Sequence, residues 1–141
     1  MIYFAKITKQ KTKEYLVEFP ELEGCFSEGS SLKEALENAK EALDGWMASN
    51  CDRDLMIPEA KNRKSKSFYP IQVDIRISFP ILLRKARKKR KLSQKQVADQ
   101  LGVSQQAYAK LETPLKANPA LNTIQKISNA LSLEFDLILA A

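Results

Sequence analysis

The residues with the clearest chemical potential lie in a short stretch of the second half of the chain. Gln105, Gln106 and Lys110 carry amide and ammonium groups and point away from the core of a helix that we expect to begin at residue 105. An amide side chain can bond adenine bidentately, and a lysine ammonium can reach the O6 and N7 atoms of guanine. The pattern therefore predicts that these three side chains contact DNA bases.

The elements that must position these side chains have the form of a helix-turn-helix. Ser93 is placed to cap a helix over residues 94–101. Ser104 is placed to cap a second helix over residues 105–112, and Gly102 lies in the turn between them. The inner faces of the two helices are marked by Val97, Ala98, Leu101, Tyr108 and Leu111. Another helix, over residues 121–131, is expected to cover the motif.

Charge is distributed unevenly along the 141 residues. Residues 1–79 carry 12 Lys and Arg against 13 Asp and Glu, whereas residues 80–141 carry 11 against 4, so the halves have net charges of −1 and +7. Seven of the eight residues from Arg84 to Lys91 are basic, on a helix that we expect to open at Pro80. We therefore predict two domains, 1–79 and 80–141, of which the second meets a polyanion and the first another kind of partner.

The segment LSQKQVADQLGVSQQ, at residues 92–106, resembles the Cro/C1-type (XRE) helix-turn-helix family. The resemblance implies base contacts by the three residues named above. It implies phosphate contacts by Gln94, Lys116 and Asn118, and an internal ion pair between Arg87 and Glu112. The segment Thr113-Pro114-Leu115 departs from the family, which usually has an Asn-Gly turn there.

The first half has the pattern of an α+β unit. Apolar residues alternate over 2–8 and 15–19, which predicts a β-hairpin, and 25–28 is a candidate third strand. Residues Ile71 to Ile77 alternate strictly, which predicts a fourth strand and the order ββ(β)αβ. We expect an all-α helix-turn-helix domain with a terminal strand to follow.

A helix is predicted between the third and fourth strands. Ser31 and Glu34 have the spacing of a capping box. An apolar stripe follows, and it consists of Ala35, Leu36, Ala39, Ala42, Leu43, Trp46 and Met47. We expect Trp46 and Met47 to pack in the core. Gly45 weakens the helix by about 1 kcal/mol relative to Ala, so the helix is expected to fray or end near it.

Three segments of the first half together resemble the HicB antitoxin family: FPELEGC at 19–25, EALENAKEAL at 34–43, and Ile57-Pro58. The similarity spans roughly residues 2–79. It implies a partial RNase H-like fold that has lost nuclease function and that binds a small, mRNA-cleaving toxin of the HicA type. It also implies an oligomer that represses its own operon.

Catalysis and metal binding are not expected. The chain has no His, and Cys25 and Cys51 stand far apart, which excludes a conventional zinc site, a CxxC redox pair and a His-based triad. Glu18 and Asp74 are isolated carboxylates on predicted strands, too few for a two-metal nuclease site. We expect a cytoplasmic protein that needs no cofactor, has reduced thiols and does not span a membrane.

The terminal segment Leu133 to Leu139 alternates like a strand, and pairing with a twofold mate would cover its apolar face. The leading hypothesis is thus an antitoxin that binds a HicA-like toxin, operator DNA and a second copy of itself. A stand-alone repressor with a ligand-sensing first domain is the main alternative. An RNA-processing enzyme is a third.

Overall fold

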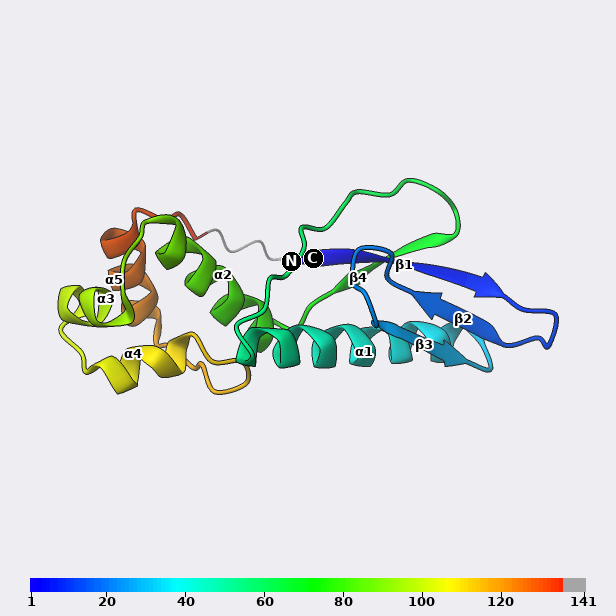
Figure 1. Ribbon diagram of the computed structural model, residues 1–141, viewed down its shortest axis with the longest axis horizontal. Helices are drawn as coiled ribbons and strands as arrows, with labels where there is room; N and C mark the ends of the chain where they lie inside the picture. The colour runs from blue at the N-terminus through cyan, green and yellow to red at the C-terminus, as the bar shows by residue number, and fades with distance from the viewer. Residues whose placement is uncertain (136–141) are drawn as a thin grey trace. The chain divides into compact units, whose positions relative to one another are not determined.

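The computed structural model describes residues 1–135 and divides into two compact units, Met1–Ser78 and a second that begins at Phe79. The first unit holds a four-stranded antiparallel sheet and one long helix, and the second is built from helices (Figure 1). The α+β class predicted for the chain is confirmed. Within residues 1–135, no helix combines the length and apolarity that a membrane span requires.

The sheet has the strand order β3-β2-β1-β4. Its strands are β1 (Ile2–Lys9), β2 (Tyr15–Glu18), β3 (Phe26–Gly29) and β4 (Phe68–Gln72). The predicted hairpin and third strand are confirmed. Every second residue of β1 from Tyr3 to Ile7 is buried, as is Val17 of β2, so one face of the sheet forms the core of this unit.

Helix α1 (Leu32–Asp52) packs on that buried face. Its core residues recur every fourth position and are Ala35, Ala39, Leu43, Met47 and Cys51. Ser31 caps the helix by accepting a hydrogen bond from the Glu34 backbone N–H at 3.1 Å. The Glu34 carboxylate completes the cap one residue earlier than predicted, because it accepts from the backbone N–H and the hydroxyl of Ser30.

Glycines have different roles at the two ends of the α1–β3 contact. A Cβ on Gly29 would lie 2.5 Å from the Ala35 backbone nitrogen, so only glycine allows β3 to approach the start of α1 this closely. Gly45 does not end the helix, contrary to expectation. The helix continues for seven residues beyond it, to Asp52, because the buried stripe continues through Met47 and Cys51.

The predicted strand from Ile71 to Ile77 is only partly correct. Strand β4 stops at Gln72, and helix α2 (Ile75–Lys89) begins three residues later, so Pro80 lies inside the helix rather than at its start. Asp74 causes this change: its backbone N–H donates to Asp44 Oδ1 at 2.9 Å, and its own carboxylate accepts from the Arg76 backbone N–H at 2.8 Å. The Arg76 guanidinium also donates to this carboxylate, at 2.8 and 3.1 Å, and these side-chain bonds together with the backbone bond lower the pKa of Asp74 to about 2.

The second unit continues from α2 with α3 (Gln94–Leu101), α4 (Gln105–Leu111) and α5 (Leu121–Leu131). Its core is formed by Leu83, Val97, Ala98, Leu101, Tyr108, Ile127 and Leu131. Residues 133–135 form no regular element, and the rest of the predicted terminal strand lies outside the described residues.

The two glycines give a matched pair of predictions. Gly29→Ala should lower the free energy of unfolding of the first unit by about 1–3 kcal/mol, since the added methyl overlaps backbone atoms. Gly45→Ala should raise it by about 0.5–1 kcal/mol, because that position is helical and open space surrounds its Cα. Urea denaturation followed by Trp46 fluorescence measures both changes, and equal effects would contradict the packing described.

Candidate nucleic-acid interface and groove

Helices α3 and α4 form a helix-turn-helix in the second unit (Figure 1). Ser93 and Gln96 form a full capping box at the start of α3. Gly102 ends α3 in the left-handed conformation with φ at 69°, which glycine adopts without strain. Ser104 then caps α4 by accepting from the Ala107 backbone N–H at 3.1 Å. Local sequence signals thus determine the whole turn.

The predicted base-contacting side chains are all exposed on α4. Gln105, Gln106 and Lys110 lie within an arc of roughly 140° around the helix, given 3.6 residues per turn. Tyr108 lies on the opposite side and is fully buried. Helix α4 is therefore held by its buried side and presents two amides and one ammonium on its outer side. These are the groups that recognise DNA bases.

A buried carboxylate connects three helices of this unit. Glu112 is 0% exposed and accepts two hydrogen bonds from the Arg87 guanidinium, at 2.6 and 2.8 Å. Tyr108 donates its hydroxyl at 2.7 Å, and Gln94 donates its amide at 3.1 Å. Arg84 adds a bond to the Glu112 backbone carbonyl at 2.9 Å. The Arg87–Glu112 ion pair implied by the family resemblance is therefore present.

This network controls the ionisation of its members. Burial opposes ionisation of Glu112, but the bonds from Arg87, Tyr108 and Gln94 outweigh it and hold the pKa of that carboxyl below its usual range. The pKa of Tyr108 is raised by burial and by the carboxylate it donates to. Glu112 is therefore an anion and Tyr108 a neutral donor at neutral pH.

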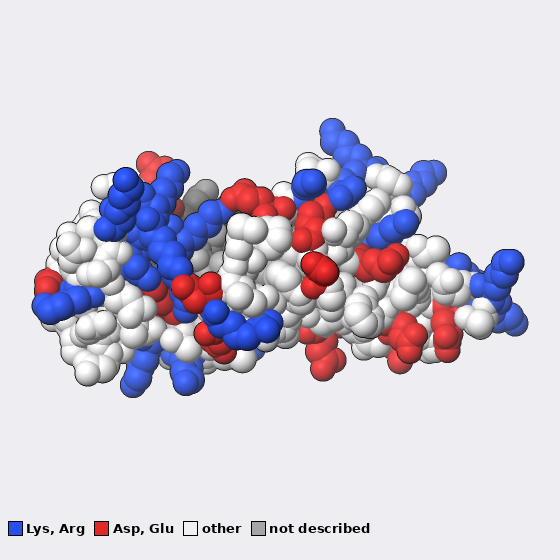
Figure 2. Space-filling model, viewed as in Figure 1, with Lys and Arg blue, Asp and Glu red and all other residues white. Residues whose placement is uncertain are grey.

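The basic run from Arg84 to Lys91, which lies on α2 and the two residues after it, separates into two sets. Its arginines turn inward: Arg84 and Arg87 bond Glu112, and Arg90 donates to the Ser132 carbonyl at 3.1 Å. Its lysines are exposed, namely Lys85, Lys88, Lys89 and Lys91. Figure 2 shows basic side chains gathered over α2. The lysines are therefore the exposed members of the run, and the arginines hold the fold.

The three residues expected on DNA phosphates have different surroundings. Gln94 is half-buried, and its amide is engaged by Glu112. Lys116 and Asn118 are exposed in the loop after α4. In that loop Leu115 has a positive φ of 64°, at the place where the family usually has Asn-Gly. The chain makes a turn there without glycine, and all three phosphate contacts stay predictions.

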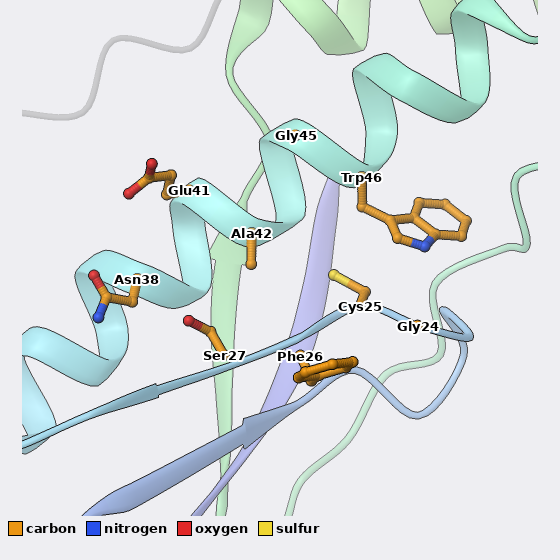
Figure 3. A pocket seen from close by; sticks show the side chains of 9 residues that line it. All are labelled: Gly24, Cys25, Phe26, Ser27, Asn38, Glu41, Ala42, Gly45 and Trp46. Carbon is orange, nitrogen blue, oxygen red and sulfur yellow. The ribbon is translucent and has the colours of Figure 1, made fainter.

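The first unit contains an open groove between β3 and α1, with a volume of about 590 Å³ (Figure 3). It is lined by Gly24, Cys25, Phe26, Ser27, Asn38, Glu41, Ala42, Gly45 and Trp46. Asn38 donates to the Glu28 carbonyl at 2.8 Å, and Trp46 donates to the Glu23 carbonyl at 3.0 Å. These two bonds join α1 to β3 and to the turn before it, so the groove has a defined shape.

The sequence pattern did not indicate this groove. Met47 is buried as expected, but Trp46 is half-buried and forms part of the groove wall. The only local signal was Gly45, which leaves the helix surface open beside Trp46. Cys25 lies at the floor, and burial raises the pKa of its thiol to about 11, so it is not a nucleophile at neutral pH. Within residues 1–135, no three His, Cys, Asp or Glu side chains are arranged to hold a metal ion.

Comparison with known proteins gives a separate result for each unit. Residues 3–74 match the family described as HicB_like antitoxin of bacterial toxin-antitoxin system, and residues 83–138 match the family described as Helix-turn-helix. The UPF0150 protein Ta0767 of Thermoplasma acidophilum is 41% identical over 58 residues, which are 41% of this chain and 84% of that protein.

A second relative is named for a helix-turn-helix. The SPbeta prophage-derived uncharacterized HTH-type transcriptional regulator YonR of Bacillus subtilis is 42% identical over 57 residues, which are 40% of this chain and 52% of that protein. The chain thus spans about half the length of this regulator. Among solved structures, the N-terminal domain of Burkholderia pseudomallei antitoxin HicB matches 52% of this chain and 99% of its own, with 19% identity and a TM-score of 0.45.

The buried network predicts a strong response to loss of its carboxylate. Glu112→Gln should lower the free energy of unfolding of the second unit by about 3–5 kcal/mol, because Arg87 keeps its charge without an anionic partner. Since folding lowers the pKa of Glu112, its stabilisation is present above the unfolded value of about 4.3 and is lost as pH falls below it.

Circular dichroism at 222 nm during urea unfolding measures this effect. The difference in free energy of unfolding between wild type and Glu112→Gln should be largest at pH 7 and should decrease in acid. Glu134→Gln, at an exposed position of the same unit, is the control and should change little. If this difference is the same at pH 7 and pH 3, the charge of Glu112 does not contribute to the stability of the unit.

Proposed function

Because this chain belongs to the HicB-like antitoxins of bacterial toxin–antitoxin systems, we propose that its first unit binds and neutralises a HicA-like, mRNA-cleaving toxin and that its second unit represses the operon encoding both proteins. The proposal is carried by one observation: a unit that matches an antitoxin family over residues 3–74 shares its chain with a helix-turn-helix whose amides and ammonium face outward. A toxin-binding module and an operator-binding module are thereby joined.

Charge supports binding of the toxin to the first unit. A protein that cleaves mRNA needs a positively charged surface to hold phosphates. Glu41 lines the groove, and two more exposed glutamates are near it in the chain, Glu37 one turn earlier on α1 and Glu23 beside the lining residue Gly24. Such residues attract a basic partner and fix its orientation. We propose that the toxin binds across the groove, with its cationic RNA-binding surface toward these carboxylates.

Operator binding is proposed for α4 and its neighbours. Gln105, Gln106 and Lys110 would contact bases, and Gln94, Lys116 and Asn118 would contact phosphates. One helix-turn-helix reads only a few base pairs, so we expect a dimer on two half-sites about 10 base pairs apart, or a multiple of that. The exposed lysines of α2 would add affinity that weakens steeply with salt.

A stand-alone repressor with a small-molecule sensor is the second candidate. The groove supports it, because about 590 Å³ lies within the usual range of ligand pockets. The two functions differ in a simple observation. An antitoxin is isolated with a small basic protein bound, whereas a sensor is isolated alone and changes its operator affinity with a metabolite.

Toxin binding is tested by reversing one charge at the groove. Glu41→Lys should weaken binding of a purified HicA-like toxin by at least tenfold, because the new charge repels a cationic partner at the groove wall. Glu14→Lys, an equal charge change at an exposed turn of the same unit, should have little effect. Isothermal titration calorimetry and rescue of growth measure both. Equal binding by the two variants would place the toxin elsewhere on the chain.

Operator recognition is tested by a double substitution on α4. Replacing Gln105 and Lys110 together by Ala should lower discrimination of operator from random DNA, since each good base contact is worth about 1–3 kcal/mol. Toxin binding should be unchanged. The control is Gln125→Ala with Lys126→Ala, which removes the same two residue types from exposed positions of α5. Fluorescence anisotropy with both DNAs is the measurement. A double variant that discriminates like wild type would exclude α4 from the groove of DNA.

A further inference from the structure

Charge is separated within the first unit, although its net charge is close to zero. Eight of the twelve Lys and Arg of residues 1–79 lie in two segments, 6–13 and 61–66, and neither segment contains Asp or Glu. The first segment runs from β1 into the turn before β2, and the second belongs to the loop that leads into β4. Figure 2 shows basic side chains over this loop and at the tip of the β1–β2 hairpin. The first unit therefore has a basic part of its own.

Strand pairing brings the two basic segments to the same end of the sheet. Lys6 of β1 is paired with Phe68 of β4 in an antiparallel register, and the Ile7 backbone N–H donates to the Ser67 carbonyl at 2.9 Å. Because the two strands are antiparallel, the chain enters β4 at the end of the sheet where it leaves β1 (Figure 1). The tip of the hairpin and the end of the loop therefore lie at one end of the sheet.

The loop is held on the sheet by Arg63. Its guanidinium donates to the Glu21 carboxylate, with Nε at 3.1 Å, and lies over the Phe68 ring at 5.0 Å from the ring centroid. The Phe68 backbone N–H donates to the Ser65 carbonyl at 3.0 Å. These contacts fix the course of the loop through its arginine and its backbone, and the lysines of the loop are exposed.

Six exposed lysines of the two segments form what we call the lysine surface. They are Lys9, Lys11, Lys13, Lys61, Lys64 and Lys66. Lys6 is left out because Glu18 is its pair on β2. The nearest acidic residues along the chain are Glu14, after the turn, and Glu59, before the loop lysines. Six ammonium groups near two carboxylates keep a net positive charge, so this surface attracts anions.

We propose that the lysine surface binds the phosphate backbone of the DNA that flanks the operator, while the second unit holds the operator itself. The inference rests on the operator binding proposed above. Clustered lysines attract phosphates whatever the base sequence, and phosphate contacts position a protein on DNA without reading it. The toxin proposed for the groove is cationic, so the lysine surface repels it and suits a different partner.

Covalent connection of the two units makes a weak contact of this kind effective. Sequence-independent binding to DNA has dissociation constants of about 10⁻⁴–10⁻⁶ M at physiological salt. When the second unit is bound to the operator, the adjoining duplex is present at an effective concentration of up to about 1 mM. The lysine surface therefore adds affinity on long DNA, although it binds weakly by itself.

The test compares two duplexes, the operator alone as delimited by footprinting and the operator extended on both sides by random sequence. Lys11→Gln with Lys64→Gln removes one charge from each segment of the full chain. Binding to the extended duplex should weaken about tenfold in low salt, and the slope of log K against log salt concentration should become shallower by about 2. Binding to the operator alone should not change. Fluorescence anisotropy over a salt series measures both quantities.

Two further variants frame this result. Lys33→Gln with Lys40→Gln makes the same change in net charge on exposed positions of α1 and should leave binding to both duplexes unchanged. Glu14→Lys adds a charge beside Lys13 and should strengthen binding to the extended duplex severalfold.

Four outcomes contradict the proposal. If Lys11→Gln with Lys64→Gln binds the extended duplex with wild-type affinity and salt slope, the lysine surface does not contact DNA, and operator binding stands without it. An equal loss on the operator alone also overturns the proposal, because that duplex has no flanking DNA. If the variant loses binding to the toxin or to a single-stranded RNA and keeps its binding to DNA, the surface belongs to that partner. A wild-type chain that does not bind the operator overturns the proposed function and this inference with it.

Discussion

The second unit depends on one buried charge. The carboxylate of Glu112 has no exposed surface and accepts hydrogen bonds from Arg87 on α2, Gln94 on α3 and Tyr108 on α4. Helices α3 and α4 have eight and seven residues, too few to be stable as isolated helices in water. Their arrangement must therefore come from contacts between them, and this network supplies the directional part. The outward side of α4, with Lys110 and its two glutamines, is oriented as a consequence.

The first unit depends on a close approach between a helix and a strand. Gly29 lets β3 approach the backbone of α1 at Ala35, and beyond that point the two elements are joined through Asn38 and Trp46. The groove occupies the space between these contacts. A single helix covers only one side of the sheet. The shape of the groove is thus set by the docking of this helix on β3.

The use of charge follows from these packing demands. Arginines of the basic run from Arg84 to Lys91 are used inside the fold, where a planar guanidinium can satisfy a carboxylate and carbonyls together. Lysines of the same run are exposed, and a flexible ammonium is a side chain suited to phosphates. The near-neutral first unit and the basic second unit are suited to a protein partner and to DNA respectively. Both requirements are met in 141 residues.

Local signals in the sequence determined the strands of the hairpin, the start of α1 and the whole helix-turn-helix, because caps, turn glycines and apolar periodicity act within a few residues. They could not decide residues 71–77, where alternation fits a strand as well as the start of a helix; the contact of Asp74 with Asp44, thirty residues away, ended β4. The groove beside Trp46 depends on helix docking, and the pairing of Lys6 with Glu18 and with Phe68 depends on strand register. Helix docking and strand register depend on contacts between distant segments, which only the tertiary structure decides.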